Sequence, residues 1–202
     1  MIERQAPAEG SQVRRAELVA AAYRLIAERG FEGLRTRDVA GEVKVNIATL
    51  HYYFPSKEDL IKGVVGHAMS RFRSTLSSDG TAIQRLRAHF HGLRRLARDE
   101  PELFGVMGEL MLRSARDASL GRIVAKMNEL WHGTLRDMLR AARAEGDLPA
   151  DIEPDGMAAV IVATLKGVYL VPGRSGSSED LEKALRQLER VLGLTGRKRA
   201  SG

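Results

Sequence analysis

The feature that most constrains this chain is a helical spacing of apolar residues along almost its whole length. One such face carries Leu18, Ala22, Leu25 and Ile26, at positions i, i+4, i+7 and i+8 of a helix. We find no convincing alternation of apolar and polar residues bounded by turns, so the pattern does not favour strands. The sequence therefore predicts an all-α fold of about nine helices in two parts, short ones first and longer ones after.

Local start and stop signals divide the first part into short helices. Gly30 should end the first helix, because glycine readily takes the left-handed conformation that follows a helix C-terminus. Thr36 and Asn46 are expected to cap a second and a third helix with their side-chain oxygens. Ser56, with an acidic residue three positions later, resembles a capping box that opens a fourth helix.

A polar break at Ser74–Gly80 marks the expected seam between two domains, which we place at residues 12–75 and 76–195. Longer stretches with helical spacing follow the break. Pro101 and Asp117 are typical helix starts, and Gly146 is a typical helix stop.

The charge balance favours an anionic partner. Lys and Arg number 32 against 26 Asp and Glu, which gives a net charge of +6 and a pI near 9.9. A basic surface suits nucleic acid, although the balance alone is a weak sign. No apolar run reaches the ~18–20 residues needed to span a bilayer, and Met1–Gly10 lacks an apolar signal region. We therefore expect a cytoplasmic protein with no membrane partner.

Signals of catalysis are missing from the sequence. The chain has no cysteine, and the motifs H-E-x-x-H, G-x-S-x-G and G-x-x-x-x-G-K-[ST] do not occur. His89 and His91 are two residues apart, so on a helix they diverge and cannot share a metal ion. We expect no enzyme activity, no catalytic residue, no cofactor and no metal.

Two short helices, at Thr36–Val43 and Asn46–Phe54, are expected to be joined by a tight connection. This is the helix-turn-helix arrangement, in which the second helix lies in the major groove of DNA and contacts base edges. Val45, Leu50 and Phe54 can pack inward, which leaves amide, hydroxyl, imidazole and methyl groups facing outward. The candidate DNA-contacting residues are Thr36, Arg37, Lys44, Asn46, Ala48, Thr49, His51, Tyr52, Tyr53 and Lys57.

Lys57 begins the next expected helix, where an ammonium group and unpaired backbone N–H groups can both hold a phosphate. Taken singly, each residue of the group also fits a plainer interpretation, since a Tyr-rich helix end is often only a half-buried packing surface. For the set as a whole, the spacing, the caps and the outward chemistry agree and favour DNA contact.

The stretch RTRDVAGEVKVNIATLHYYFPSKEDLI, Arg35–Ile61, closely resembles the DNA-binding region of the tetracycline-repressor (TetR) family. Two residues depart from the family pattern. Lys44 stands where the turn commonly has glycine, so it either takes a strained conformation at a cost of about 1 kcal/mol or the turn differs. His51 stands where the family usually has a tyrosine that contacts phosphate, and an imidazole is shorter.

The stretch AEGDLPADIEPDGMAAVIVATLKGVYL, residues 144–170, looks like the loop and first dimerisation helix of the same family. The resemblance implies an all-helical homodimer in which the two final helices of each subunit form a four-helix interface. Apolar stripes on the last two helices fit such an interface, through Met157, Ile161, Leu165, Leu181, Leu185 and Leu188. The alternative is that these stripes form an ordinary core within one chain.

The resemblance also implies a small-molecule effector site among the central helices. Its candidate residues are His89, Phe104, Met107, Met111, Met127 and Trp131. A lining rich in methionine and aromatic residues suits an apolar or amphipathic ligand, because methionine adapts to irregular shapes. Each of these residues equally fits an ordinary core.

These observations predict a DNA-binding transcriptional repressor that binds a near-palindromic operator as a homodimer. Its DNA binding is expected to be controlled by a small apolar or amphipathic effector. The alternative is an architectural protein that coats double-stranded DNA without sequence preference or effector. Residues 1–76 hold 12 Lys and Arg against 9 Asp and Glu, which is a weaker basic field than such a coating protein needs.

Overall fold

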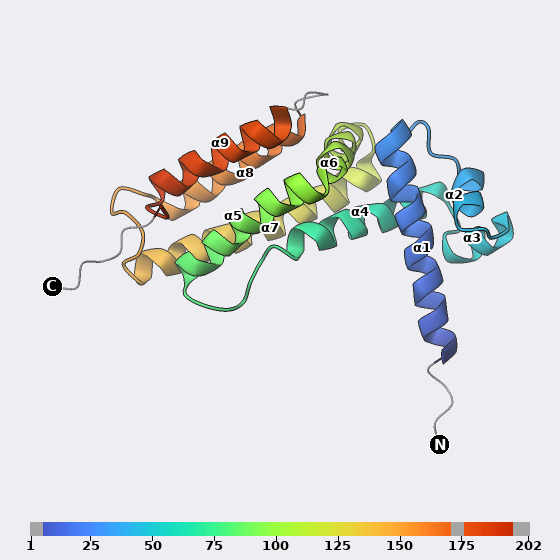
Figure 1. Ribbon diagram of the computed structural model, residues 1–202, viewed down its shortest axis with the longest axis horizontal. Helices are drawn as coiled ribbons and strands as arrows, with labels where there is room; N and C mark the ends of the chain where they lie inside the picture. The colour runs from blue at the N-terminus through green and yellow to red at the C-terminus, as the bar shows by residue number, and fades with distance from the viewer. Residues whose placement is uncertain (1–5, 171–175, 196–202) are drawn as a thin grey trace, which may run out of the picture. The chain divides into compact units, whose positions relative to one another are not determined.

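The computed structural model describes residues 6–170 and 176–195, and every regular element within these ranges is a helix (Figure 1). The helices are α1 (Ala6–Arg29), α2 (Thr36–Glu42), α3 (Ile47–Tyr53), α4 (Lys57–Arg73), α5 (Ala82–Asp99), α6 (Pro101–Ser114), α7 (Ala118–Ala144), α8 (Pro154–Leu170) and α9 (Gly176–Val191). The prediction of an all-α fold is confirmed for this part of the chain.

Helix ends in the first part follow the expected local signals at three of four positions. Gly30 has a φ of 68° directly after α1. Asn46 caps α3, because its Oδ1 accepts the backbone N–H of Thr49 at 2.7 Å. The Ser56 hydroxyl oxygen accepts the backbone N–H of Asp59 at 3.1 Å, which fixes the start of α4.

The cap expected at Thr36 was wrong. Arg35 is the N-cap of α2, with an extended backbone (φ −117°, ψ 130°) and no side-chain hydrogen bond to the helix. Thr36 is already the first helical residue, and a capping side chain must come from the residue just before the first turn.

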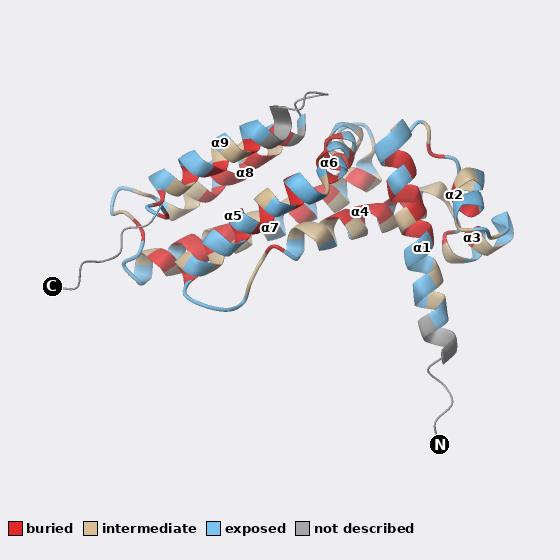
Figure 2. Ribbon diagram, in the orientation of Figure 1, coloured by how far each residue is buried: buried red, intermediate tan, exposed pale blue. Residues whose placement is uncertain are grey.

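The first compact unit, Met1–Ser70, is held by a core between α1, α2, α3 and α4. Its buried side chains include Leu18, Leu25, Leu50, Phe54, Leu60 and Val64. Figure 2 shows that the buried part of α1 lies in its second half. A Cβ on Gly63 of α4 would lie 2.9 Å from Val19 Cγ2, so α4 approaches α1 too closely for a larger residue.

The second compact unit, Arg71–Gly202, contains α5 to α9. Within it, α7 packs against α5, α6 and α8, and α9 packs against α5 and α8. Arg94 of α5 holds α9 through three hydrogen bonds of 2.7 Å, one to Glu182 and two to Glu189.

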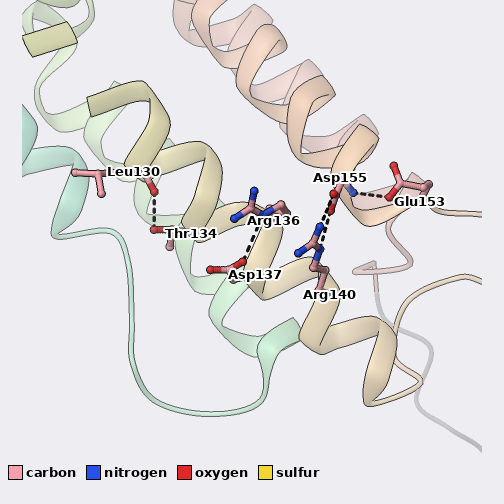
Figure 3. Close-up of polar contacts among 7 residues, drawn as sticks. All are labelled: Leu130, Thr134, Arg136, Asp137, Arg140, Glu153 and Asp155. Carbon is pink, nitrogen blue, oxygen red and sulfur yellow. Dashed lines mark hydrogen bonds and ion pairs between the residues drawn. The ribbon is translucent and has the colours of Figure 1, made fainter. Parts of the chain in front are cut away.

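A polar seam joins the C-terminal half of α7 to the start of α8 (Figure 3). Arg140 Nε donates to Asp155 Oδ1 at 2.8 Å, and this pairing keeps the pKa of Asp155 below its usual value. Glu153 accepts the backbone N–H of Asp155 at 2.8 Å. These contacts set the position at which α8 leaves the preceding loop.

Candidate functional site

The connection between α2 and α3 is a tight turn with Lys44 at its centre. Lys44 has a φ of 56° and is the one non-glycine residue with positive φ in the described part of the chain. Its N–H donates to Gly41 O at 3.0 Å, and the N–H of Val45 donates to Ala40 O at 2.9 Å. Of the two outcomes expected at Lys44, the structure therefore shows the strained conformation rather than a different turn.

α3 has one buried and one exposed face. Leu50 and Phe54 are almost fully buried, which confirms that they pack inward, whereas Val45 is only half-buried. Tyr52 is 79% exposed, and its ring forms a T-shaped contact with the ring of Tyr53 at a centroid distance of 5.1 Å. Of the other candidates on this face, Asn46, Ala48 and His51 are exposed and Thr49 is half-buried. The structure thus gathers the predicted α3 residues on one surface.

Hydrogen bonds at the start of α3 determine which polar atoms of Asn46 are still free to contact DNA. Asn46 Oδ1 accepts both the N–H of Thr49 at 2.7 Å and its hydroxyl at 2.9 Å. The amide nitrogen of Asn46 bonds to none of the described residues and can still donate. Because reading adenine with two bonds takes both the oxygen and the nitrogen of an amide, Asn46 is better suited to donate to a phosphate.

The acidic residues of α2 are neutralised from α1. Arg29 lies 3.4 Å from Asp38, and Arg24 lies 3.6 Å from Glu42. Sequence reasoning missed both arginines, since their partners are 9 and 18 positions away in the chain and no local spacing links them. The pairs reduce the negative charge beside α3, which favours the approach of a phosphate backbone.

Three of the predicted DNA-contacting residues on or beside these elements are cations. Arg37 and Lys44 are exposed, and neither forms an ion pair within the described ranges. Lys57 is half-buried at the first position of α4, and its Nζ lies 3.5 Å from the carbonyl oxygen of Phe31. At least two N–H groups of that ammonium stay available for an anion.

The candidate effector residues fall into two groups. His89, Phe104, Met107 and Met127 are buried, whereas Met111 and Trp131 are half-buried. The structure brings His89 and Trp131 together: Trp131 Nε1 donates to His89 Nε2 at 3.2 Å. The other ring nitrogen, Nδ1, lies 2.7 Å from the hydroxyl of Thr75, a residue that sequence reasoning missed. His89 therefore has no ring nitrogen left to anchor an effector in this conformation.

The candidate dimer residues lie mainly inside one chain. Ile161, Leu165, Leu181, Leu185 and Leu188 are at most 6% exposed, and Met157 is half-buried. The five buried side chains form the core between α8, α9 and their neighbours, which is the alternative that the sequence left open. The outward face of α8 is a different set: Gly156, Ala159, Val160, Ala163, Gly167 and Leu170.

Two other kinds of site are not found in residues 6–170 and 176–195. No group of three or more His, Asp or Glu side chains there is arranged to hold a metal ion. None of the helices described is long and apolar enough to cross a membrane.

Comparison with known proteins decides the family. Residues 18–64 match the model of bacterial regulatory proteins of the tetR family. Residues 82–195, more than half of the chain, match the model of the C-terminal domain of BetI-type transcriptional repressors. This chain belongs to the TetR family. It is a DNA-binding transcription regulator and not an enzyme.

Relatives of this TetR-family protein support the assignment over most of its length. The transcriptional repressor KstR of Mycobacterium tuberculosis is 26% identical over 197 residues, which is 95% of this chain and 86% of KstR. KstR of Mycolicibacterium smegmatis is also 26% identical, over 94% of this chain and 92% of that protein.

Solved structures show the same fold. A TetR regulator from Haloarcula marismortui superposes with a TM-score of 0.79 at 19% identity, covering 91% of this chain and 98% of that one. AibR, solved in complex with isovaleryl coenzyme A and operator DNA, gives a TM-score of 0.66 at 18% identity, covering 89% and 98%.

Proposed function

We propose that this TetR-family protein is a repressor that binds a near-palindromic operator as a two-fold homodimer and is controlled by a small apolar or amphipathic effector. The observation that carries the DNA-binding part is the exposed polar face of α3, held by the buried Leu50 and Phe54. The relatives named as transcriptional repressors support the direction of control. Such a protein acts in the cytoplasm, where the DNA lies.

We assign two roles to the DNA-contacting residues. Ala48, Thr49 and Tyr52 contact base edges, because they lie on the outward face near the start and middle of α3. The positioning group holds phosphates through hydroxyl, amide, imidazole or cationic groups and consists of Thr36, Arg37, Lys44, Asn46, His51, Tyr53 and Lys57. We place this domain at residues 12–75 and the effector and dimerisation domain at residues 76–195.

The homodimer is proposed to form through the outward face of α8. Gly156, Ala159, Ala163 and Gly167 carry small side chains, and Val160 is 50% exposed and Leu170 is 49% exposed. A Cβ placed on Gly167 would meet nothing within 4 Å, so a second helix can approach there. A two-fold axis through this face would pair α8 with its own copy.

The effector is proposed to bind beside α7. Asn128 Oδ1 is buried and accepts no hydrogen bond from the part of the chain that the structure describes. Trp131 lies three positions after Asn128 on α7, so one apolar ligand with a donor group would satisfy the amide and contact the indole. The complex of AibR with isovaleryl coenzyme A and operator DNA supports an effector of this general kind.

Selection of bound sequences from a pool of random double-stranded DNA tests the proposal. We expect one enriched motif made of two inverted half-sites, about one helical turn or a multiple of it apart, because a two-fold dimer presents two reading helices. A bound pool without any enriched motif would instead support the architectural alternative.

A further inference from the structure

Three side chains from different segments form one line of hydrogen bonds, of which His89 and Thr75 are buried and Trp131 is half-buried. His89 on α5 is 1% exposed, and its two ring nitrogens contact Trp131 of α7 and Thr75, which follows α4. Thr75 is 5% exposed, and its hydroxyl lies 2.6 Å from the carbonyl oxygen of Phe72 in the last turn of α4. The line therefore runs from the middle of α7, through α5, to the end of α4.

Only one arrangement of protons satisfies these contacts. The Thr75 hydroxyl has one proton, which it donates to the Phe72 carbonyl, so it must accept a proton from His89 Nδ1. Nε2 then carries a lone pair, which accepts the indole N–H of Trp131, a group that can only donate. Burial lowers the pKa of His89 to about 4, so the imidazole stays neutral near pH 7 and keeps this tautomer.

Packing fixes the end of α4 at the same place. A Cβ on Gly92 would lie 2.6 Å from the Cβ of Thr75, so Thr75 sits directly on α5, one turn from His89. The ring of Phe72 meets Phe104 of α6 edge-on at a centroid distance of 5.7 Å. Arg71 Nε donates to Glu100 at 2.9 Å. The last turn of α4 is therefore held by hydrogen bonds, an ion pair and an aromatic contact.

We propose that Trp131, His89 and Thr75 form a relay that couples the environment of α7 to the end of α4, and through this helix to DNA binding. The relay rests on the proposed function, since it gives the effector beside α7 a route to the DNA-binding unit. α4 begins at Lys57, a proposed phosphate contact, and ends at Arg73, two residues before Thr75. A ligand that takes the indole N–H leaves His89 Nε2 buried without a partner, which favours a rearrangement of the line.

The relay can be tested without knowing the effector, because coupling between two binding sites is reciprocal. Trp131 is the only tryptophan, so its indole ¹⁵N–¹H signal in an NMR spectrum is unambiguous. The probe is DNA that the protein itself selects from a random pool. We expect the indole signal of the unchanged protein to shift when this DNA binds.

Three variants separate the relay from a merely structural effect. Thr75→Val keeps the shape of the side chain and removes the hydroxyl, so the DNA-induced shift should be lost. Thr75→Ser keeps the hydroxyl and should retain the shift. Thr134→Val is the matched control, because the Thr134 hydroxyl donates to Leu130 O of its own helix (Figure 3) and bonds to no other described residue. The indole shift in Thr134→Val should match that in the unchanged protein.

The outcomes distinguish failure of the proposed function from failure of the relay. If no DNA is selected, the proposed function fails, which is a different outcome from failure of the relay. If DNA binds and the indole signal of the unchanged protein does not move, the relay is refuted without any variant. A shift that persists in full in folded Thr75→Val would refute it as well, whereas loss in Thr75→Val with retention in Thr75→Ser supports it.

Discussion

Lys44 holds a backbone conformation that glycine adopts at lower cost, and its ammonium group beside α3 forms no ion pair with the described residues. We expect Lys44→Gly to raise the free energy of unfolding by about 1 kcal/mol, because the strain at φ 56° is relieved. The same change should weaken binding to all DNA sequences alike and lower the salt-dependence slope by about one, because one phosphate contact is lost. Urea unfolding and a salt titration measure the two effects.

Lys44→Asn is the companion variant, since asparagine tolerates positive φ and carries no charge. It should show the same loss of slope with a smaller gain in stability. A full slope in both variants would mean that Lys44 does not contact phosphate.

The lowered pKa of His89 predicts that the free energy of unfolding depends on pH. Burial lowers its pKa from 6.5 to about 4, so between these values the unfolded chain binds a proton that the folded chain does not. The contribution of neutral His89 to the free energy of unfolding is therefore fully present above about pH 6.5 and is lost as the pH drops toward 4. Between about pH 7.5 and pH 5 the free energy of unfolding should fall by about 2 kcal/mol. Urea unfolding at these two pH values measures the difference.

His89→Gln supplies the control, because it lacks the titrating ring. Its stability should fall by much less over the same range. Asp59 and Asp155 have pKa values below the usual 3.8, so their contribution is lost only at lower pH. An equal fall in the variant and the unchanged protein would show that other groups cause the dependence.

Among the helices, α5 and α9 are joined by an ion-pair network centred on Arg94. Arg94→Met should lower the free energy of unfolding by about 1–2 kcal/mol, because two carboxylates lose charged hydrogen bonds in a partly exposed site. Arg98→Met is the matched control: among the described residues Arg98 pairs only with the adjacent Asp99, and its side chain is 72% exposed, so the effect of this change should stay within about 0.5 kcal/mol. Equal urea midpoints for the two variants would contradict a role for the network.

Helix positions were predictable where a local signal decides them. Asn46 caps α3 and Gly30 ends α1 as expected, because a cap or a positive φ depends on a few adjacent residues. The cap predicted at Thr36 was wrong, because α2 begins one residue earlier than expected and Arg35 is its N-cap. Arg35 makes no side-chain hydrogen bond to the helix, so no local signal in the sequence marked this boundary.

Contacts between distant segments were not predictable from the sequence. Helical spacing identified the apolar stripe through Ile161 and Leu165, but it cannot tell whether the partner is the same chain or a second copy. Thr75 and Trp131 lie 14 and 42 positions from His89, and no spacing rule links them. The inward side of α3 could be predicted because Leu50 and Phe54, the C-cap of this helix, are only four residues apart.

For the whole molecule, the proposed homodimer depends on the small outward residues of α8. Ala163→Glu should dissociate it, because two carboxylates would be buried without partners at the two-fold axis. We expect a loss of about 3 kcal/mol or more, over 100-fold in the dissociation constant. Size-exclusion chromatography with light scattering measures the mass.

Ala88→Glu, on an exposed position of α5, is the matched control and should leave the mass unchanged. If the unchanged protein is a monomer at micromolar concentration, the two-fold mechanism is wrong whatever the variants do.

The most direct measurement of sequence-specific operator binding is a competition titration at one fixed salt concentration. The selected operator competes against DNA of the same length and composition in which one half-site is scrambled, and then both. The dimer account predicts a loss of affinity with the first scrambled half-site and a total difference of about 10³-fold or more with both. Equal affinity for all three DNAs would contradict it and leave a protein that binds DNA without reading its sequence.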